Sequence, residues 1–194
     1  MNILVFFSNT GIMSTKLFIN NVRQFFHCSI SRLDLGLEEW KKYALFEHMK
    51  NYTRNLIATD NATFTLLLLC WNPDKESPIH DHPCDGCWLR VCEGSVRETR
   101  YEIDEVADSL EVTSDETFES GSLTFISDFM GFHKVGNTSK TDPAVTMHLY
   151  CPPFKQCKIW LDPSQASRPS NAYMCNYSEY GDKDACNLFE VNYI

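Results

Sequence analysis

The stretch IHDHPCDGCWLRVCEG, residues 79–94, carries two histidines two positions apart, at His80 and His82. Side chains at i and i+2 of an extended strand point to the same face, so the two imidazoles can converge while Asp81 points away. A third histidine, His133, lies far downstream. Three neutral imidazoles leave a bound metal its positive charge and several free coordination positions. Such a site suits an ion that must bind a substrate and dioxygen together.

A His-x-His pair can also arise by chance, because short motifs have many false matches. Here the pair follows a loop at residues 72–78 and precedes a turn at Glu93-Gly94-Ser95, which is typical of a hairpin. The third histidine stands at the start of another predicted strand. This context favours metal binding over a chance pair.

The pattern of apolar residues predicts β-strands from about residue 52 onward. Residues 63–71, TFTLLLLCW, form a near-continuous apolar run that is typical of a strand buried on both faces. Residues 88–92 and 96–103 flank the turn at Gly94. The acidic stretch 104–119 is interpreted mainly as a solvated hairpin and loop. Further short strands are predicted at 110–112, 123–127, 133–135, 144–151, 157–161 and 173–177, and this spacing favours an all-β sandwich or barrel.

Helical periodicity marks the first fifty residues. Apolar residues recur on one helical stripe after the candidate N-cap Ser14, and a second candidate helix covers residues 37–49. A chain of 194 residues is long enough for one domain with a sizeable core. We therefore expect a single domain over residues 1–194, with a helical part at 1–50 and a β core at about 52–181.

Composition excludes some classes of function. The net charge of -9 argues against a nucleic-acid surface. No run of 18 apolar residues appears, so no membrane-spanning helix is predicted. The nine cysteines are odd in number and lack a paired CxxC…CxxC spacing, which favours reduced, intracellular thiols. Cys84 and Cys87 form one isolated pair that could suggest a zinc or redox element.

The histidine motifs resemble those of cupins. The spacing His80-x-His82-x4-Cys87-x6-Gly94 is similar to the first cupin motif, with Cys87 where most cupins carry a ligating Glu. The segment around His133 resembles the second motif. This cysteine is characteristic of animal-type cysteine dioxygenases. The resemblance to that family runs from about residue 38 to 181 and includes residues 52–56 (YTRNL), 69–82 and 143–154 (PAVTMHLYCPPF).

The resemblance implies a mainly β fold, a cupin (jelly-roll-like) β-barrel with N-terminal helices. It also implies an enzyme that adds both atoms of O2 to the sulfur of free L-cysteine, giving cysteine sulfinic acid. One Fe(II) per chain would be held by His80, His82 and His133. The implied protein is a cytoplasmic monomer of cysteine catabolism and taurine biosynthesis, with no nucleic-acid or membrane partner.

Five residues match the family's substrate pocket. Tyr52 and Arg54 stand at i and i+2, so both can face one cavity. A surface salt bridge is the commoner fate of a single Arg, but a guanidinium is well suited to hold a substrate carboxylate. Leu69, Cys157 and Met174 match positions that line the pocket, although ordinary β-barrel core is equally consistent with them.

A row of polar side chains lies within the apolar segment 144–151. Thr146, His148 and Tyr150 alternate with Met147 and Leu149, so the polar and apolar residues face opposite ways. An unpaired polar group in the interior is costly, so the row favours a site over simple packing. The resemblance implies that Thr146, where the family usually has Ser, orients His148, which orients the Tyr150 hydroxyl.

Cys87 has three possible roles: a zinc ligand, an inert core thiol, or a partner in covalent modification. The resemblance implies the third, a thioether crosslink between Cys87 and Tyr150.

Two other functions remain open. A related dioxygenase could act on cysteamine or a peptide's N-terminal Cys, but these substrates lack the carboxylate that Arg54 would bind. A cupin that only binds a metal would have no need of the row at Thr146, His148 and Tyr150.

Overall fold

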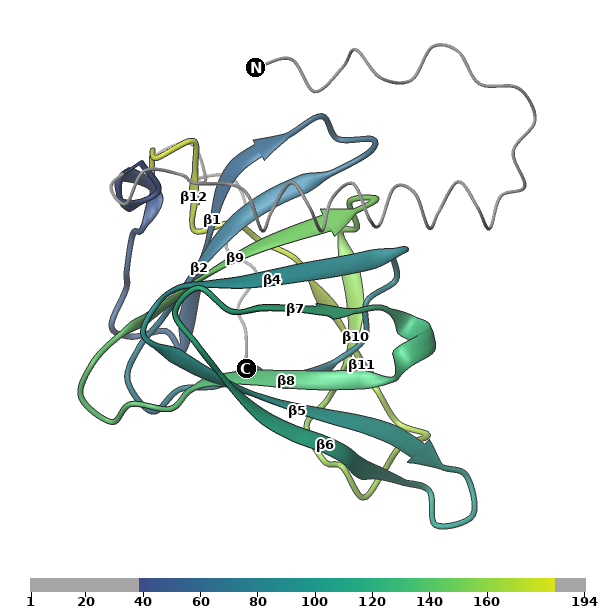
Figure 1. Ribbon diagram of the computed structural model, residues 1–194. Helices are drawn as coiled ribbons and strands as arrows, with labels where there is room; N and C mark the ends of the chain where they lie inside the picture. The colour runs from purple at the N-terminus through teal and green to yellow at the C-terminus, as the bar shows by residue number, and fades with distance from the viewer. Residues whose placement is uncertain (1–38, 184–194) are drawn as a thin grey trace. The chain divides into compact units, whose positions relative to one another are not determined.

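A computed structural model describes residues 39–183, all within one compact unit, Asp34–Ile194 (Figure 1). These residues are mainly β and form two six-stranded sheets. The first sheet has the order β12 (Ser178–Glu179), β1 (Tyr52–Thr59), β2 (Thr65–Trp71), β9 (Ala144–Cys151), β4 (Gly86–Glu93) and β7 (Leu123–Ile126). The second has the order β11 (Ser170–Tyr173), β10 (Gln156–Trp160), β3 (Ile79–His80), β8 (Phe132–Asn137), β5 (Ser95–Asp104) and β6 (Ser109–Glu119). The prediction of a mainly β, jelly-roll-like fold is confirmed.

Strand β9 lies between β2 and β4 and is buried along its whole length. Its two faces contact different apolar clusters. Ala144 and Tyr150 belong to the cluster between the sheets, which also includes Val96 from β5 and Val135 from β8. Val145 and Met147 pack on the other side, with residues that include Trp40. Strand β2 is likewise covered on both faces, with Leu67 in the first cluster and Leu68 in the second, which explains its near-continuous apolar run.

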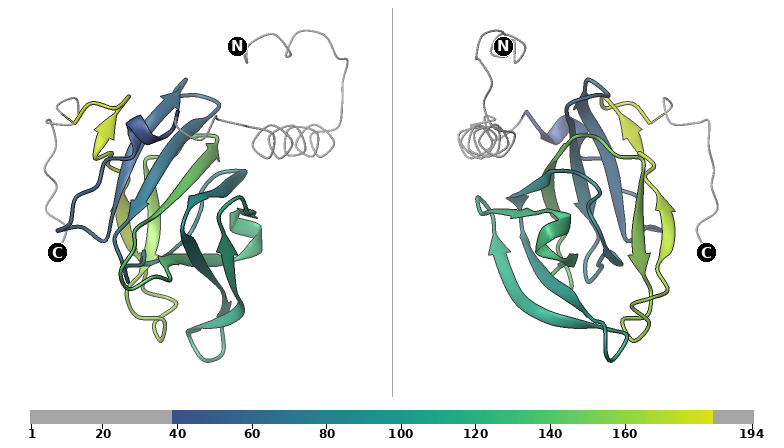
Figure 2. Two further views of the ribbon diagram at one scale, coloured as in Figure 1. Left: turned by 60° about the vertical axis from the view of Figure 1, so that its left-hand side comes forward. Right: turned by 90° about the vertical axis from the view of Figure 1, so that its right-hand side faces the viewer.

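The two sheets do not close into a barrel within residues 39–183. Each strand pairs only with strands of its own sheet, and the sheets contact one another through side chains. Figure 2 shows one sheet lying against the other in two turned views. The predicted closed β-barrel is therefore corrected to a double sheet.

The turn at Gly94 is not a hairpin. β4 and β5, which flank it, belong to different sheets, so the chain crosses between the sheets here. Gly94 has φ 74°, and a Cβ atom at this position would lie 3.0 Å from the Pro143 carbonyl oxygen. This backbone conformation favours glycine in a corner as well as in a hairpin, so the local pattern could not separate the two.

The helix predicted over residues 37–49 is wrong for its described part. Residues 39–49 contain only a short 3-10 helix, η2 (Lys41–Tyr43). The Leu45 carbonyl accepts hydrogen bonds from the Thr53 hydroxyl and the Asn55 amide on β1. Contacts with β1 therefore replace helical hydrogen bonds at this carbonyl. The helix predicted after Ser14 lies outside the described residues.

The acidic stretch at residues 104–119 contains the predicted hairpin, since β5 and β6 pair from Asp104 and Ser109 onward, but not the predicted loop. It forms the eleven-residue strand β6, which pairs with β5 at the edge of its sheet. Much of β6 is exposed, which explains its acidic composition. Within residues 39–183, no helix is long and apolar enough to cross a membrane.

Candidate metal centre and substrate pocket

Three histidines converge on one point between the strands. His80 lies on β3, His82 follows two residues later, and His133 lies on β8 directly opposite His80. The ring centroids are 4.6–4.8 Å apart. One possible ligand nitrogen from each side chain lies within 4.8 Å of the others. The predicted three-histidine group is therefore assembled.

Hydrogen bonds define the orientation of two of these rings. The Nδ1–H of His80 donates to the Pro78 carbonyl at 3.0 Å, because a carbonyl can only accept. The Nδ1 of His133 lies 2.6 Å from the Glu98 carboxylate. Each bond places the proton on Nδ1 and leaves the Nε2 lone pair for a metal. The backbone N–H of His82 donates to the Asp128 carboxylate at 2.6 Å, which holds the segment after β3.

The imidazoles are in the protonation state that a metal needs. Burial lowers the pKa of His80 to about 4. Burial, reinforced by neighbouring imidazoles, holds the pKa values of His82 and His133 well below the usual range. All three are therefore neutral at pH 7, the form that ligates metals. Three imidazole donors suit several first-row transition metals, iron among them.

Two of the three histidines line a cavity together with the predicted substrate residues. The cavity has a volume of about 880 Å³, and both His80 and His133 line it. Five residues predicted to bind substrate also line it: Tyr52, Arg54, Leu69, Cys157 and Met174. Strands β1, β2 and β10, with the segment after β11, bring these positions together from distant parts of the chain.

Arg54 offers an unused donor in this cavity. Its guanidinium carbon lies 5.6 Å from the centroid of the Tyr150 ring, and the guanidinium hydrogen-bonds to the Tyr150 hydroxyl. The buried Nε atom has no hydrogen-bond partner among the described residues. A buried cationic donor without a partner is costly, and a carboxylate is the ligand best matched to it.

The polar row of β9 forms a hydrogen-bonded chain that begins at Trp71. The indole Nε1–H of Trp71 donates to Thr146 Oγ1 at 2.8 Å, and this oxygen lies 2.8 Å from His148 Nε2. The buried hydroxyl can use its own proton only by donating to His148 Nε2. His148 then carries its proton on Nδ1, which lies 3.4 Å from the Tyr150 hydroxyl.

Cys87 lies at the end of this chain. It is buried on β4 directly opposite Tyr150, with its sulfur 3.9 Å from His148 Nδ1. Among residues 39–183, the group able to hold a metal consists of the three histidines and does not include Cys87. Both Cys84 and Cys87 are free thiols. The geometry thus places Cys87 beside Tyr150 rather than in a zinc element.

The sequence does not predict three hydrogen bonds of the site. They join Glu98 to His133, Trp71 to Thr146, and Asp128 to the backbone N–H of His82. For Glu98 a signal existed. Val96, Glu98 and Arg100 alternate on a predicted strand, which puts two charges on the face of a core valine. Trp71 and Asp128 carry no comparable signal, because a tryptophan fits the apolar run 63–71 and Asp128 is an exposed acidic residue.

The chain is similar in sequence to known proteins. A family model described as cysteine dioxygenase type I matches residues 28–162. The chain is 35% identical to cysteine dioxygenase type 1 of Rattus norvegicus over 74% of this chain and 70% of the relative. It is 32% identical to the protein of the same name from Danio rerio over 75% of this chain and 72% of the relative.

Solved structures of cupins also match. One is the cupin domain of an XRE family transcriptional regulator from Enterobacter cloacae, with 14% identity, a TM-score of 0.41, and coverage of 54% of this chain and 100% of that one.

Proposed function

The chain belongs to the cysteine dioxygenase type I family, and from this premise we propose that it adds both atoms of O2 to the sulfur of free L-cysteine. The product is cysteine sulfinic acid. The sulfur is oxidised and O2 is reduced, so the reaction balances without another reductant. The observation that carries the proposal is that Arg54 lines the same cavity as His80 and His133, two of the three histidines of the candidate metal centre.

The proposed cofactor is one Fe(II) per chain, held by His80, His82 and His133. When bound, iron would favour the thiolate form of the substrate and supply the reactivity toward O2 that protein side chains lack. The neutral, Nδ1-protonated imidazoles of His80 and His133 support this assignment.

Arg54 would bind the substrate carboxylate. Its unpartnered Nε and its place in the cavity support this role. A planar guanidinium can hold a carboxylate through two parallel hydrogen bonds, which fixes the orientation of the substrate. Tyr52, Leu69, Cys157 and Met174 would then surround the rest of the amino acid.

The chain from Trp71 to Tyr150 would orient the catalytic hydroxyl. With its proton on Nδ1, His148 donates toward the oxygen of Tyr150, so the phenolic proton of Tyr150 is directed elsewhere in the cavity. Burial raises the pKa of Tyr150, so the group remains a proton donor at neutral pH. Tyr150 would donate a hydrogen bond to the reacting groups.

A thioether between Cys87 and Tyr150 would tie β4 to the catalytic strand. A carbon–sulfur bond forms between the thiol sulfur and a ring carbon, each group loses one hydrogen, and O2 accepts both. The direct pairing of the two residues supports this modification. We further propose that the protein is a cytoplasmic monomer of cysteine catabolism and taurine biosynthesis. The free thiols of the described cysteines agree with a reducing compartment.

Oxygen uptake by the iron-loaded protein tests the proposed function. The protein is loaded with Fe(II) anaerobically, its metal content is measured, and O2 uptake is recorded with L-cysteine, cysteamine or a peptide with an N-terminal Cys. Uptake with L-cysteine and formation of the sulfinic acid, seen by mass spectrometry, are expected. Preference for either of the other thiols would favour a related thiol dioxygenase, and iron binding without uptake would favour a non-enzymatic cupin.

A further inference from the structure

A buried charged pair lies behind one of the three histidines and has no role in the proposed reaction. Glu98 is 2% exposed and the side chain of Arg100 is 20% exposed, and both belong to β5. Burying charges is costly unless they are paired and hydrogen-bonded. The position of this pair next to the metal centre therefore calls for an explanation.

The two carboxylate oxygens of Glu98 have different partners. Oε1 accepts the Nδ1–H of His133 at 2.6 Å. Oε2 accepts hydrogen bonds from Arg100 and from the Thr124 hydroxyl, both at 3.0 Å. Arg100 also donates to the Phe125 carbonyl at 2.9 Å. One oxygen thus faces the candidate ligand, while the other is held by a cation and a hydroxyl.

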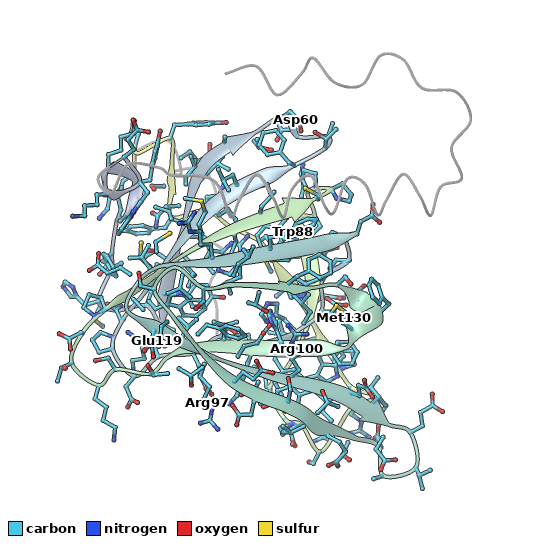
Figure 3. All side chains as sticks on the ribbon, viewed as in Figure 1. Asp60, Trp88, Arg97, Arg100, Glu119 and Met130 are labelled. Carbon is cyan, nitrogen blue, oxygen red and sulfur yellow. The ribbon has the colours of Figure 1, made fainter. Side chains whose placement is uncertain are left out.

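The strand register explains how Glu98 reaches the histidine. Arg100 stands directly opposite His133, whereas Glu98 stands opposite Val135. The Glu98 carboxylate therefore reaches His133 along the diagonal between β5 and β8. Thr124 and Phe125 belong to β7 in the other sheet. Arg100, labelled in Figure 3, therefore connects the two sheets beside the metal centre.

The three histidines differ in what holds them. His80 donates to a neutral carbonyl, and the buried Nδ1 of His82 has no hydrogen-bond partner among the described residues. Of the three side chains, His133 is the one held by a carboxylate. A carboxylate fixes the tautomer and orientation of an imidazole and makes it a stronger ligand than a carbonyl does.

We propose that Glu98 is a positioning residue of the metal centre, which holds His133 with its Nε2 lone pair toward the metal and strengthens metal binding, and that Arg100 holds Glu98 in place. This inference rests on the proposed metal site. Most cupins have a ligating Glu where this chain has Cys87, so no carboxylate binds the metal directly from that position. The carboxylate of Glu98 would instead act on the metal through His133.

The competing explanation is that the pair only ties the two sheets together. The two explanations predict different effects for two substitutions. Thr124→Val removes a bond between the sheets and leaves the bond from Glu98 to His133 in place. Glu98→Gln keeps the size of the side chain and removes the charge that faces His133.

Metal affinity is measured with Zn²⁺ alone, in competition with a chromophoric chelator. Relative to wild type, Glu98→Gln is expected to weaken Zn²⁺ binding about 10–100-fold, while Thr124→Val changes it by less than about twofold. Glu102→Gln is the matched control, because it removes an exposed carboxylate from the same strand. Its affinity for Zn²⁺ is expected to equal that of wild type.

A spectroscopic signature accompanies the affinities. In Zn²⁺-loaded protein labelled with ¹⁵N-histidine, the Nδ1–H of His133 should give a strongly downfield proton resonance in wild type and Glu102→Gln. The resonance should move upfield or vanish in Glu98→Gln. A pair that only ties the two sheets together would lower the unfolding temperature of Glu98→Gln without changing its affinity for Zn²⁺.

The outcomes separate this inference from the proposed function. Equal Zn²⁺ affinity of wild type and Glu98→Gln would overturn the role of Glu98 and leave the metal site standing. Failure of wild type to bind Zn²⁺ or Fe(II) would overturn the metal site and this inference with it. If Glu98→Gln does not fold, the wild-type spectrum decides, since absence of the downfield resonance contradicts the proposed bond.

Discussion

Cys87 and Tyr150 are direct cross-strand neighbours, paired in register where β4 runs antiparallel to β9. Both side chains are buried, and the two groups are hydrogen-bonded to each other. A bond between them would require little movement of the backbone, because the sheet already holds both residues in place. It would also fix the orientation of the Tyr150 ring at the cavity. Less conformational entropy would then be lost when the hydroxyl is positioned for the reaction.

Aerobic maturation should therefore crosslink these residues. Protein incubated with iron, cysteine and O2 is expected to contain a Cys87–Tyr150 peptide two hydrogens lighter than the sum of its parts, as seen by peptide mass mapping. Cys87→Ser should lack the peptide and turn over more slowly without losing activity, because the metal ligands and Arg54 remain. Recovery of Cys87 only as a free thiol, or bonded to Cys84, would contradict the crosslink.

Loss of any one metal ligand should abolish activity. His80→Ala, His82→Ala and His133→Ala are each expected to lose most bound iron and nearly all O2 uptake, because two imidazoles hold Fe(II) weakly. Metal analysis after anaerobic loading measures the first effect, and an oxygen electrode measures the second. His48→Ala, at an exposed histidine, is the control. A variant with the iron content and rate of wild type would remove that residue from the ligand set.

Arg54→Ala should raise KM for cysteine steeply. Removing one partner of a buried charge pair costs about 2–5 kcal/mol, and the loss should appear mainly in KM. Arg97→Ala is the matched control, because the exposed Arg97, labelled in Figure 3, forms an ion pair with Asp115. Wild type should turn over cysteamine poorly, since that amine leaves Arg54 unpaired. Comparable turnover of the two thiols at low concentration would reject the role of Arg54.

The hydroxyl of Thr146 should matter more than its methyl group. Thr146→Val leaves Trp71 Nε1 and His148 Nε2 without their shared partner, which costs about 1–3 kcal/mol, or roughly 5–150-fold if all of it appears in kcat. Thr146→Ser keeps the hydroxyl and should stay close to wild type. Steady-state kinetics of the two variants at saturating cysteine measure the difference. Equal rates for Val and Ser would show that the hydroxyl does not orient His148.

The metal-free protein should lose stability as the pH falls. Burial depresses the pKa of His80 to about 4 and those of His82, His133 and His148 well below 6.5. The unfolded chain therefore binds more protons than the folded one below about pH 6.5, and the free energy of unfolding decreases from there toward pH 4. Urea unfolding at several pH values measures the slope, which should be shallower in His148→Gln. A slope of zero between pH 7 and 5 would contradict burial of these imidazoles as neutral groups.

The errors of sequence interpretation have physical causes. The segment at residues 37–49 has helical periodicity, but the Leu45 carbonyl is hydrogen-bonded by side chains of β1, and tertiary contacts override local preference. The acidic stretch 104–119 predicts a solvated hairpin and loop, and the structure has the hairpin with a long strand in place of the loop. An edge strand with an exposed face does not require an apolar pattern, so β6 carries none. The corner at Gly94 resembles a hairpin because both require the same backbone conformation.

Local periodicity by itself determined that Thr146, His148 and Tyr150 alternate with apolar residues, because the period of two belongs to any single strand. It also predicted that His80 and His82 converge, and they do, although β3 ends at His80 and His82 lies just beyond it. Only the tertiary structure decided that His133 stands opposite His80, that Cys87 stands opposite Tyr150, and that Glu98 reaches His133. These relations depend on which strands pair and in what register. Pairing is settled by burial and contacts between residues 35 to 63 positions apart, which no local pattern contains.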